Sequence, residues 1–170
     1  MPTIFKTYNK MRKILLLLVL TLSISLANAQ KNYPNITLKN LDNKEVNLVE
    51  RSKDKLLVIS FWATWCGPCI QELEAINDEY EDLQEEMDFE LIAVSIDNSR
   101  SVSRVKPMVN GKDWDYEVLL DTNQEMKKAL NFSAPPYLLI IKDGKILYTH
   151  SGYTPGSEEE AFEKFRELSK

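Results

Sequence analysis

The chain of 170 residues contains two cysteines and one histidine, and this shortage limits its chemistry. A structural zinc site needs four ligands, and only His150 is available to join Cys66 and Cys69. No segment carries a flavin or nicotinamide motif, and neither internal repeats nor low-complexity stretches occur. We therefore expect no cofactor and no structural metal.

The chain also lacks an apolar run of membrane-spanning length. Residues 14–26 are apolar over about 13 positions, whereas a spanning helix needs roughly 20. Basic residues precede this run, and Ala27-Asn28-Ala29 follows with small residues at the positions that a signal peptidase reads. We interpret residues 1–29 as a secretory signal peptide, starting at Met1 or Met11, and residues 30–170 as the mature domain. An uncleaved anchor is the alternative.

Signal removal takes away four lysines and arginines and no acids, so the formal charge changes from -5 to -9. Such an acidic domain is poorly suited to nucleic acid or anionic membranes. Its length of about 140 residues suits one domain with a single core. We expect an exported, soluble, periplasmic monomer.

Hydrophobic spacing predicts an alternation of strands and helices. Residues 36–39 and 45–48 read as a hairpin, residues 56–62 as a strand buried on both faces, and the segment from Pro68 to residue 87 as one amphipathic helix. The other predicted elements are a strand at 89–97, helices at 99–109 and 122–130, an extended piece before 120, a hairpin of 137–141 and 145–149, and a helix to 168 opened by a Ser157/Glu160 capping box. This order predicts an α/β fold with a central mixed sheet flanked by helices.

The two cysteines form a Cys-x-x-Cys motif directly after the predicted strand at 56–62. A strand that passes through this motif into a helix places the first sulfur at the helix N-terminus, where the dipole favours thiolate over thiol. Cys66 is then the nucleophile and Cys69 the resolving thiol. The alternative, a purely structural disulfide, would close so short a loop that it would stabilise little.

The segments FWATWCGPC at residues 61–69 and APPYLLI at residues 134–140 resemble the thioredoxin superfamily. The chain is most similar to the exported TlpA/ResA-like thiol-disulfide oxidoreductases over essentially all of the mature part. This resemblance implies a thioredoxin-like fold with an N-terminal β-hairpin extension.

The resemblance also implies a substrate-binding surface around the dithiol. Pro135 would be the cis-proline facing Cys66, with Pro136 in place of a threonine, although a trans Pro-Pro that merely opens a strand is the alternative. Trp62 either joins an apolar rim or packs in the core. The residues implied to contact substrate are Trp65, Gly67, Pro68, Ala134 and Pro135.

Glu72 matches the acid that many TlpA/ResA-like proteins carry three residues after the second cysteine. A carboxyl group beside Cys69 would exchange its proton during catalysis, and desolvation would raise its pKa. The alternative is an ordinary acid favoured by the helix dipole. Thioredoxins proper have an aspartate six residues before the first cysteine, where this chain has Ser60.

The Gly67-Pro68 dipeptide favours a disulfide reductase or an isomerase-like role, because it places no cationic side chain between the cysteines. The resemblance implies protein disulfide substrates and a membrane-embedded thiol electron donor. Apocytochrome c thiols or misoxidised proteins are the expected clients.

Other classes of function remain open at this point. A dithiol oxidase would use the same pair in the opposite direction, and a copper-delivery module would add His150 to the two sulfurs, although this histidine is also typical of an ordinary surface residue. A peroxiredoxin is disfavoured, because Ala63 stands where its threonine would be.

Overall fold

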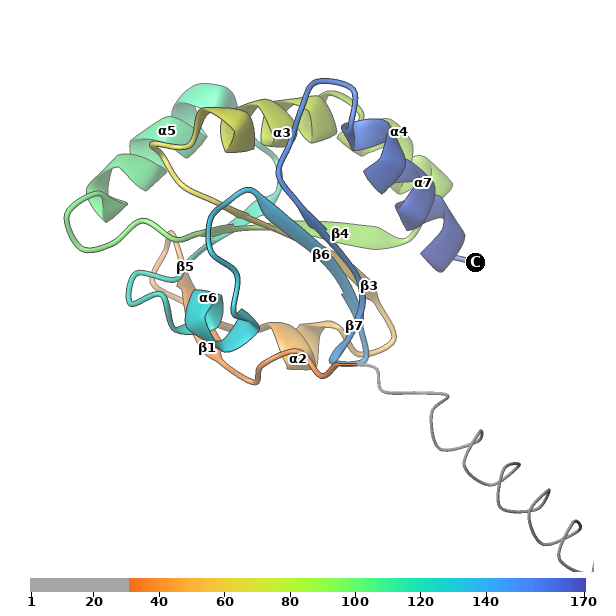
Figure 1. Cartoon of the computed structure of the whole chain (residues 1–170), viewed down its shortest axis with the longest axis horizontal. Helices are drawn as coiled ribbons and strands as arrows, with labels where there is room; N and C mark the ends of the chain where they lie inside the picture. The colour runs from red at the N-terminus through yellow and green to blue at the C-terminus, as the bar shows by residue number, and fades with distance from the viewer. Residues whose placement is uncertain (1–30) are drawn as a thin grey trace, which may run out of the picture. The chain divides into compact units, whose positions relative to one another are not determined.

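The computed structural model describes residues 31–170, which form one seven-stranded mixed sheet with helices on both faces (Figure 1). The strand order is β2-β1-β5-β4-β3-β6-β7. The predicted α/β class with a mixed central sheet is confirmed. The predicted signal peptide at residues 1–29 lies outside the described residues.

The most buried strand is β3 (Leu56–Trp62), in which all seven residues are buried. It pairs in parallel with β4 (Phe89–Ser95) and antiparallel with β6 (Tyr137–Lys142). The sheet continues through β5 (Glu117–Leu120), parallel to β4, and through β7 (Lys145–Ser151), which forms the predicted hairpin with β6. Because β3 is buried on both faces, its continuous apolar run identifies it correctly from sequence.

The predicted N-terminal hairpin is confirmed as β1 (Thr37–Asn40) and β2 (Glu45–Asn47). β1 also pairs antiparallel with β5, so the hairpin extends the main sheet. The strand predicted to reach residue 48 ends earlier, because Asn47 caps α2 (Leu48–Arg51) by accepting two backbone N–H groups.

Helices cover both faces of the sheet in two groups (Figure 1). The first group is α3 (Gly67–Asp78), α4 (Tyr80–Glu86), α5 (Val105–Lys112) and α7 (Glu158–Leu168), and the second is α2 with α6 (Glu125–Leu130). The helix predicted at 99–109 is present as α5, which starts later because a 3-10 turn, η1 (Val102–Arg104), precedes it. The helix predicted at 122–130 is present as α6, which also starts later. Within residues 31–170, no helix has both the length and the apolar character needed to cross a bilayer.

The prediction of one continuous helix to residue 87 is wrong, because α3 and α4 are separate. Glu79 lies between them with φ -106° and ψ 1°, outside helical geometry. The ring of Tyr80, just after this break, packs edge-on against Phe89 and Tyr116 at centroid distances of 5.7 and 6.0 Å. These tertiary contacts fix the direction of α4, and apolar spacing along the chain does not reveal them.

The final helix is confirmed, but its predicted capping box is wrong. Ser157 adopts helical angles, φ -77° and ψ -11°, and its hydroxyl accepts a hydrogen bond from the N–H of Thr154 at 3.2 Å. Glu160 instead accepts a hydrogen bond from the hydroxyl of Tyr148 at 3.2 Å. A capping serine needs extended backbone angles to reach the N–H groups of the first turn, so this serine does not serve as one.

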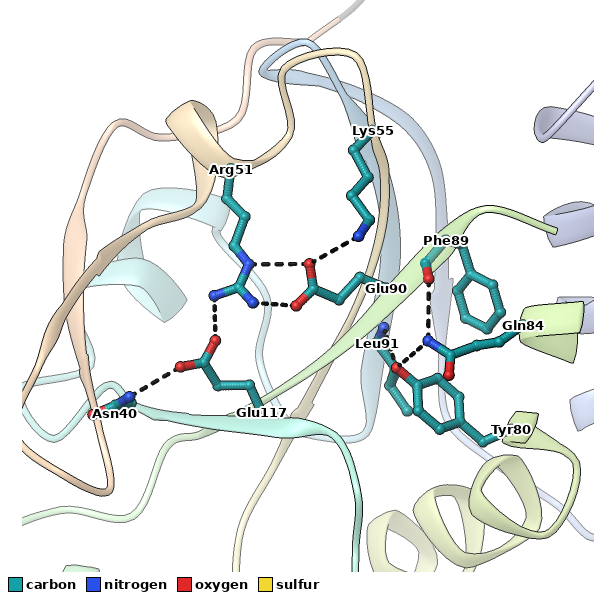
Figure 2. A network of polar contacts seen from close by, with 9 residues as sticks. All are labelled: Asn40, Arg51, Lys55, Tyr80, Gln84, Phe89, Glu90, Leu91 and Glu117. Atoms are coloured by element: carbon teal, nitrogen blue, oxygen red, sulfur yellow. Dashed lines mark hydrogen bonds and ion pairs between the residues drawn. The ribbon is translucent and has the colours of Figure 1, made fainter.

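A polar network joins the hairpin extension to the central strands (Figure 2). The guanidinium of Arg51 pairs with the carboxylates of Glu90 and Glu117, and Lys55 lies 3.7 Å from Glu90. Asn40 donates to Glu117 at 3.0 Å. Glu90 and Glu117 lie at the N-terminal ends of β4 and β5, so the network occupies the sheet edge opposite the one at which β3 ends.

Candidate active site

The two cysteines lie where β3 gives way to α3. Their sulfurs are joined in a disulfide, with Cα atoms 5.3 Å apart. Cys66 is the N-cap residue of α3, and its sulfur accepts a hydrogen bond from the backbone N–H of Cys69 at 3.3 Å. The interaction of the Cys66 sulfur with the helix N-terminus, expected from the motif, is therefore present.

Exposure separates the two sulfur-bearing residues. Cys66 retains 6% of its accessible surface, whereas Cys69 is fully buried one turn into α3. The first turn of α3 contains no acidic residue to offset the positive end of the helix dipole. A thiolate is therefore favoured on the cysteine that an incoming disulfide can reach.

Glu72 lies on the buried face of α3 and retains only 4% of its accessible surface. Burial raises its pKa to about 7, and a 2.8 Å hydrogen bond donated by the Ser60 hydroxyl opposes this rise. Its position beyond the first turn and its burial disagree with the alternative of an ordinary dipole-stabilised acid. Glu72 also helps to raise the pKa of Tyr153 to about 12, after the larger effects of burial and the hydrogen bond with Glu158.

Ser60 is a site residue whose role the sequence reasoning missed. It lies on β3 and is fully buried, and its hydroxyl reaches the carboxylate of Glu72 on α3. The available signal was a single hydroxyl within an otherwise apolar strand, at the position where thioredoxins proper have their acid. A buried polar group needs a partner, and the nearby helix supplies one.

The proline loop requires a correction. The cis peptide bond joins Pro135 to Pro136, so the cis-proline is Pro136, and the assignment of this role to Pro135 is wrong by one residue. Both bonds in Ala134-Pro135-Pro136 are X-Pro bonds with a small trans preference, so local chemistry does not choose between them. Tyr137 begins β6 opposite Phe61 of β3, which places this loop beside the strand end that leads to Cys66.

The residues next to the dithiol in sequence differ in their exposure to solvent. Trp65 is 59% exposed and is the only exposed large hydrophobic side chain among residues 31–170. Gly67 and Pro68 are also exposed, and a Cβ atom built on Gly67 would meet nothing within 4 Å. Trp62, in contrast, is fully buried and packs edge-on against Trp114 at 5.1 Å, so it belongs to the core.

The structure does not bring His150 to the two cysteines. It lies on β7 opposite Leu138, and its ring contacts the hydroxyl of Tyr148 at 3.5 Å. In the described part of the chain, no three potential ligands among His, Cys, Asp and Glu are grouped for a metal ion. The third ligand required by the copper alternative is therefore absent from the dithiol.

A helix-capping disulfide with one reachable and one buried sulfur, set at the end of a central strand, defines a thioredoxin-like thiol-disulfide oxidoreductase. The Redoxin family model matches residues 28–165, and the chain belongs to this family.

Known proteins agree with this class. Thiol-disulfide oxidoreductase ResA from Bacillus thuringiensis is 32% identical over 123 residues, which cover 72% of this chain and 69% of that protein. A solution structure of a thioredoxin-like protein from Porphyromonas gingivalis is 43% identical, with a TM-score of 0.69 over 84% of this chain and 94% of that one. A thiol-disulfide oxidoreductase from Bacteroides fragilis shares the fold, with a TM-score of 0.63, 23% identity, and coverage of 81% of this chain and 99% of that one. The expected ResA-like identity and thioredoxin-like fold are confirmed.

Proposed function

We propose that this protein is an exported disulfide reductase in which Cys66 attacks substrate and Cys69 completes the exchange. The observation that carries the proposal is the asymmetry of the pair: Cys66 caps α3 and retains 6% of its accessible surface, whereas Cys69 retains none. Trp65, Gly67, Pro68, Ala134 and Pro135 are proposed to contact the substrate chain.

The reaction follows ordinary thiol-disulfide exchange. The Cys66 thiolate attacks one sulfur of a substrate disulfide, which breaks and leaves the other substrate sulfur as a thiolate that takes up a proton. The Cys69 thiol then loses its proton and attacks Cys66, releasing the second substrate thiol. Two electrons pass from the dithiol to the substrate, and Cys66 and Cys69 end as the observed disulfide.

Glu72 is proposed as the proton acceptor for Cys69. Both residues lie three positions apart on the buried side of α3, and a carboxyl with a pKa of about 7 exchanges protons readily near neutral pH. Ser60 then holds the carboxylate in place through its hydrogen bond. The two groups together supply a base on the buried side of α3.

The reducing direction is proposed from the modest acidification that this site offers. The helix dipole contributes up to about 2 kcal/mol, or roughly 1.5 pK units, and the exposed Gly67-Pro68 dipeptide adds no cation. Equilibration of the purified protein with glutathione buffers tests the direction. A midpoint near that of thioredoxin, about -270 mV, supports a reductase, whereas one above about -150 mV identifies an oxidant.

A Gly67→His variant is expected to be a stronger oxidant of its substrates than the unmodified protein. The new side chain has free space, and its imidazolium would stabilise the Cys66 thiolate and hence the reduced form. We expect the thiol pKa to fall and the midpoint potential to rise by roughly 30 mV, which corresponds to about 1.4 kcal/mol. Gly67→Gln is the matched uncharged control, and equal potentials for the two variants would contradict an electrostatic origin.

Export is proposed from residues 1–29 as a signal peptide, with the domain at 30–170 active as a soluble periplasmic monomer. N-terminal sequencing of the protein recovered from the periplasm should begin near Gln30. A membrane-embedded thiol protein would reduce the Cys66–Cys69 disulfide after each turnover, and apocytochrome c or misoxidised proteins would be the clients. Capture of mixed disulfides on a Cys69→Ser variant would identify them.

A further inference from the structure

Asp97 lies just after β4 and is fully buried, yet none of the chemistry above uses it. Three donors converge on its carboxylate. The backbone N–H of Thr64 donates at 2.8 Å, the Thr64 hydroxyl at 2.7 Å and the Ser95 hydroxyl at 2.9 Å. Its own N–H donates to the Ser95 hydroxyl oxygen at 3.1 Å. Burying a carboxylate raises the free energy of the folded state unless hydrogen bonds of this kind compensate, so these three donors are what allows Asp97 to be buried.

The position of Thr64 gives this cluster its significance. β3 ends at Trp62, and α3 begins at Gly67, with Cys66 as its cap. Thr64 therefore belongs to the short connection that carries the nucleophile, and this connection lacks the hydrogen bonds of the sheet ladder. Within it, the Cys66 N–H donates to the Ala63 carbonyl at 3.0 Å, the Cys66 carbonyl accepts from the Ile70 N–H at 3.2 Å, and Thr64 donates twice to Asp97.

The disulfide holds the Cys66 sulfur near α3 in the oxidised protein, but reduction removes that covalent link. The position of the sulfur then depends on noncovalent contacts, among them the hydrogen bonds that hold the connection from β3 in place. We propose that Asp97 is a positioning residue that fixes the Thr64 turn and so keeps the reduced Cys66 sulfur at the N-terminus of α3. The inference rests on the proposed role of Cys66 as the attacking thiol.

Geometry and charge predict opposite results, which makes the proposal testable. If Asp97 acts through hydrogen bonds, its loss moves Cys66 away from the dipole and raises the thiol pKa. If it acts as a buried negative charge, its loss lowers the thiol pKa. Asp97→Asn removes the charge, but its amide oxygen accepts from the Thr64 N–H and its amide nitrogen donates to the Thr64 hydroxyl.

The experiment measures the alkylation rate of Cys66 against pH in the reduced full-length protein. Asp97→Ala should slow alkylation at neutral pH by about threefold, the factor expected from losing a part of the helix-dipole stabilisation, while Asp97→Asn stays near the unmodified protein. Thr64→Val, which replaces the hydroxyl with a methyl group, should reproduce part of the loss, and Thr64→Ser, which keeps a hydroxyl, should react at the normal rate. These two variants keep the test valid if Asp97→Ala does not fold.

The outcomes separate this inference from the proposed function. Equal acceleration in Asp97→Ala and Asp97→Asn would assign Asp97 a charge effect and overturn the positioning role. Unchanged rates in Asp97→Ala and Thr64→Val would overturn it as well, while leaving an acidic Cys66 intact. If the unmodified protein already alkylates like free cysteine, the proposed role of Cys66 fails first.

Discussion

A Cys66→Ser variant is expected to lose disulfide reduction completely, because serine supplies no thiolate to attack the substrate. The buried Cys69 does not replace it, since none of its surface is accessible. Insulin reduction with a chemical dithiol as electron source measures the loss, and the rate should fall to that of the dithiol alone. A variant that still reduced insulin above this background would contradict the assignment of the nucleophile.

Cys69→Ser is the matched control for this result. It retains the reachable thiol at the cap of α3, so the first attack should proceed and the mixed disulfide on Cys66 should accumulate. Mass spectrometry of the protein after exposure to an oxidised peptide measures the adduct. Its absence in Cys69→Ser would contradict the order of the two steps.

In the unmodified protein, the free energy of unfolding should fall as the pH rises from acidic to mildly alkaline values. In a Glu72→Gln variant, we expect most of this fall to be absent. The pKa of Glu72 is about 7 in the folded chain and near 4.5 when unfolded, so the folded state binds the proton more tightly. Its contribution is fully present below about pH 4.5 and is lost as the pH rises through about 7. Between about pH 5 and pH 8 this amounts to about 2.5 kcal/mol, to be measured by urea unfolding of the oxidised protein at the two pH values.

Ser60→Ala provides a control in which the carboxyl of Glu72 is kept and its pKa is changed. The Ser60 hydrogen bond favours the charged carboxylate, so its removal should raise the pKa of Glu72 above about 7 and move the decline in stability to higher pH. If Glu72→Gln retained the pH dependence of the unmodified protein, the carboxyl would not be the buried acid described here. Slower resolution of the mixed disulfide in Glu72→Gln would add support for its role as proton acceptor.

The central strands and the dithiol were predictable because their signals are local. An apolar run with no polar interruption except Ser60 is typical of a strand buried on both faces, and the cysteine spacing fixes the site at its end. The helix after Pro68 was also apparent from its apolar spacing. Its break at Glu79 was not, since the contacts that direct Tyr80 come from strands distant in sequence.

The side-chain pairings that the sequence did not reveal are those that depend on long-range packing. Ser60 and Glu72 lie 12 residues apart, and Thr64 and Asp97 lie 33 apart, on elements that meet only in the folded sheet. The choice between two adjacent prolines likewise depends on the surroundings of the loop. Sequence patterns identified the chemical groups, whereas the three-dimensional fold determined which of them act together.

The pH dependence of Cys66 alkylation in the reduced protein tests the central claim most directly. The account predicts a midpoint of roughly 7, because the sulfur caps α3 and accepts the backbone N–H of Cys69. A midpoint at about 8.5, the value of a free cysteine, would contradict it.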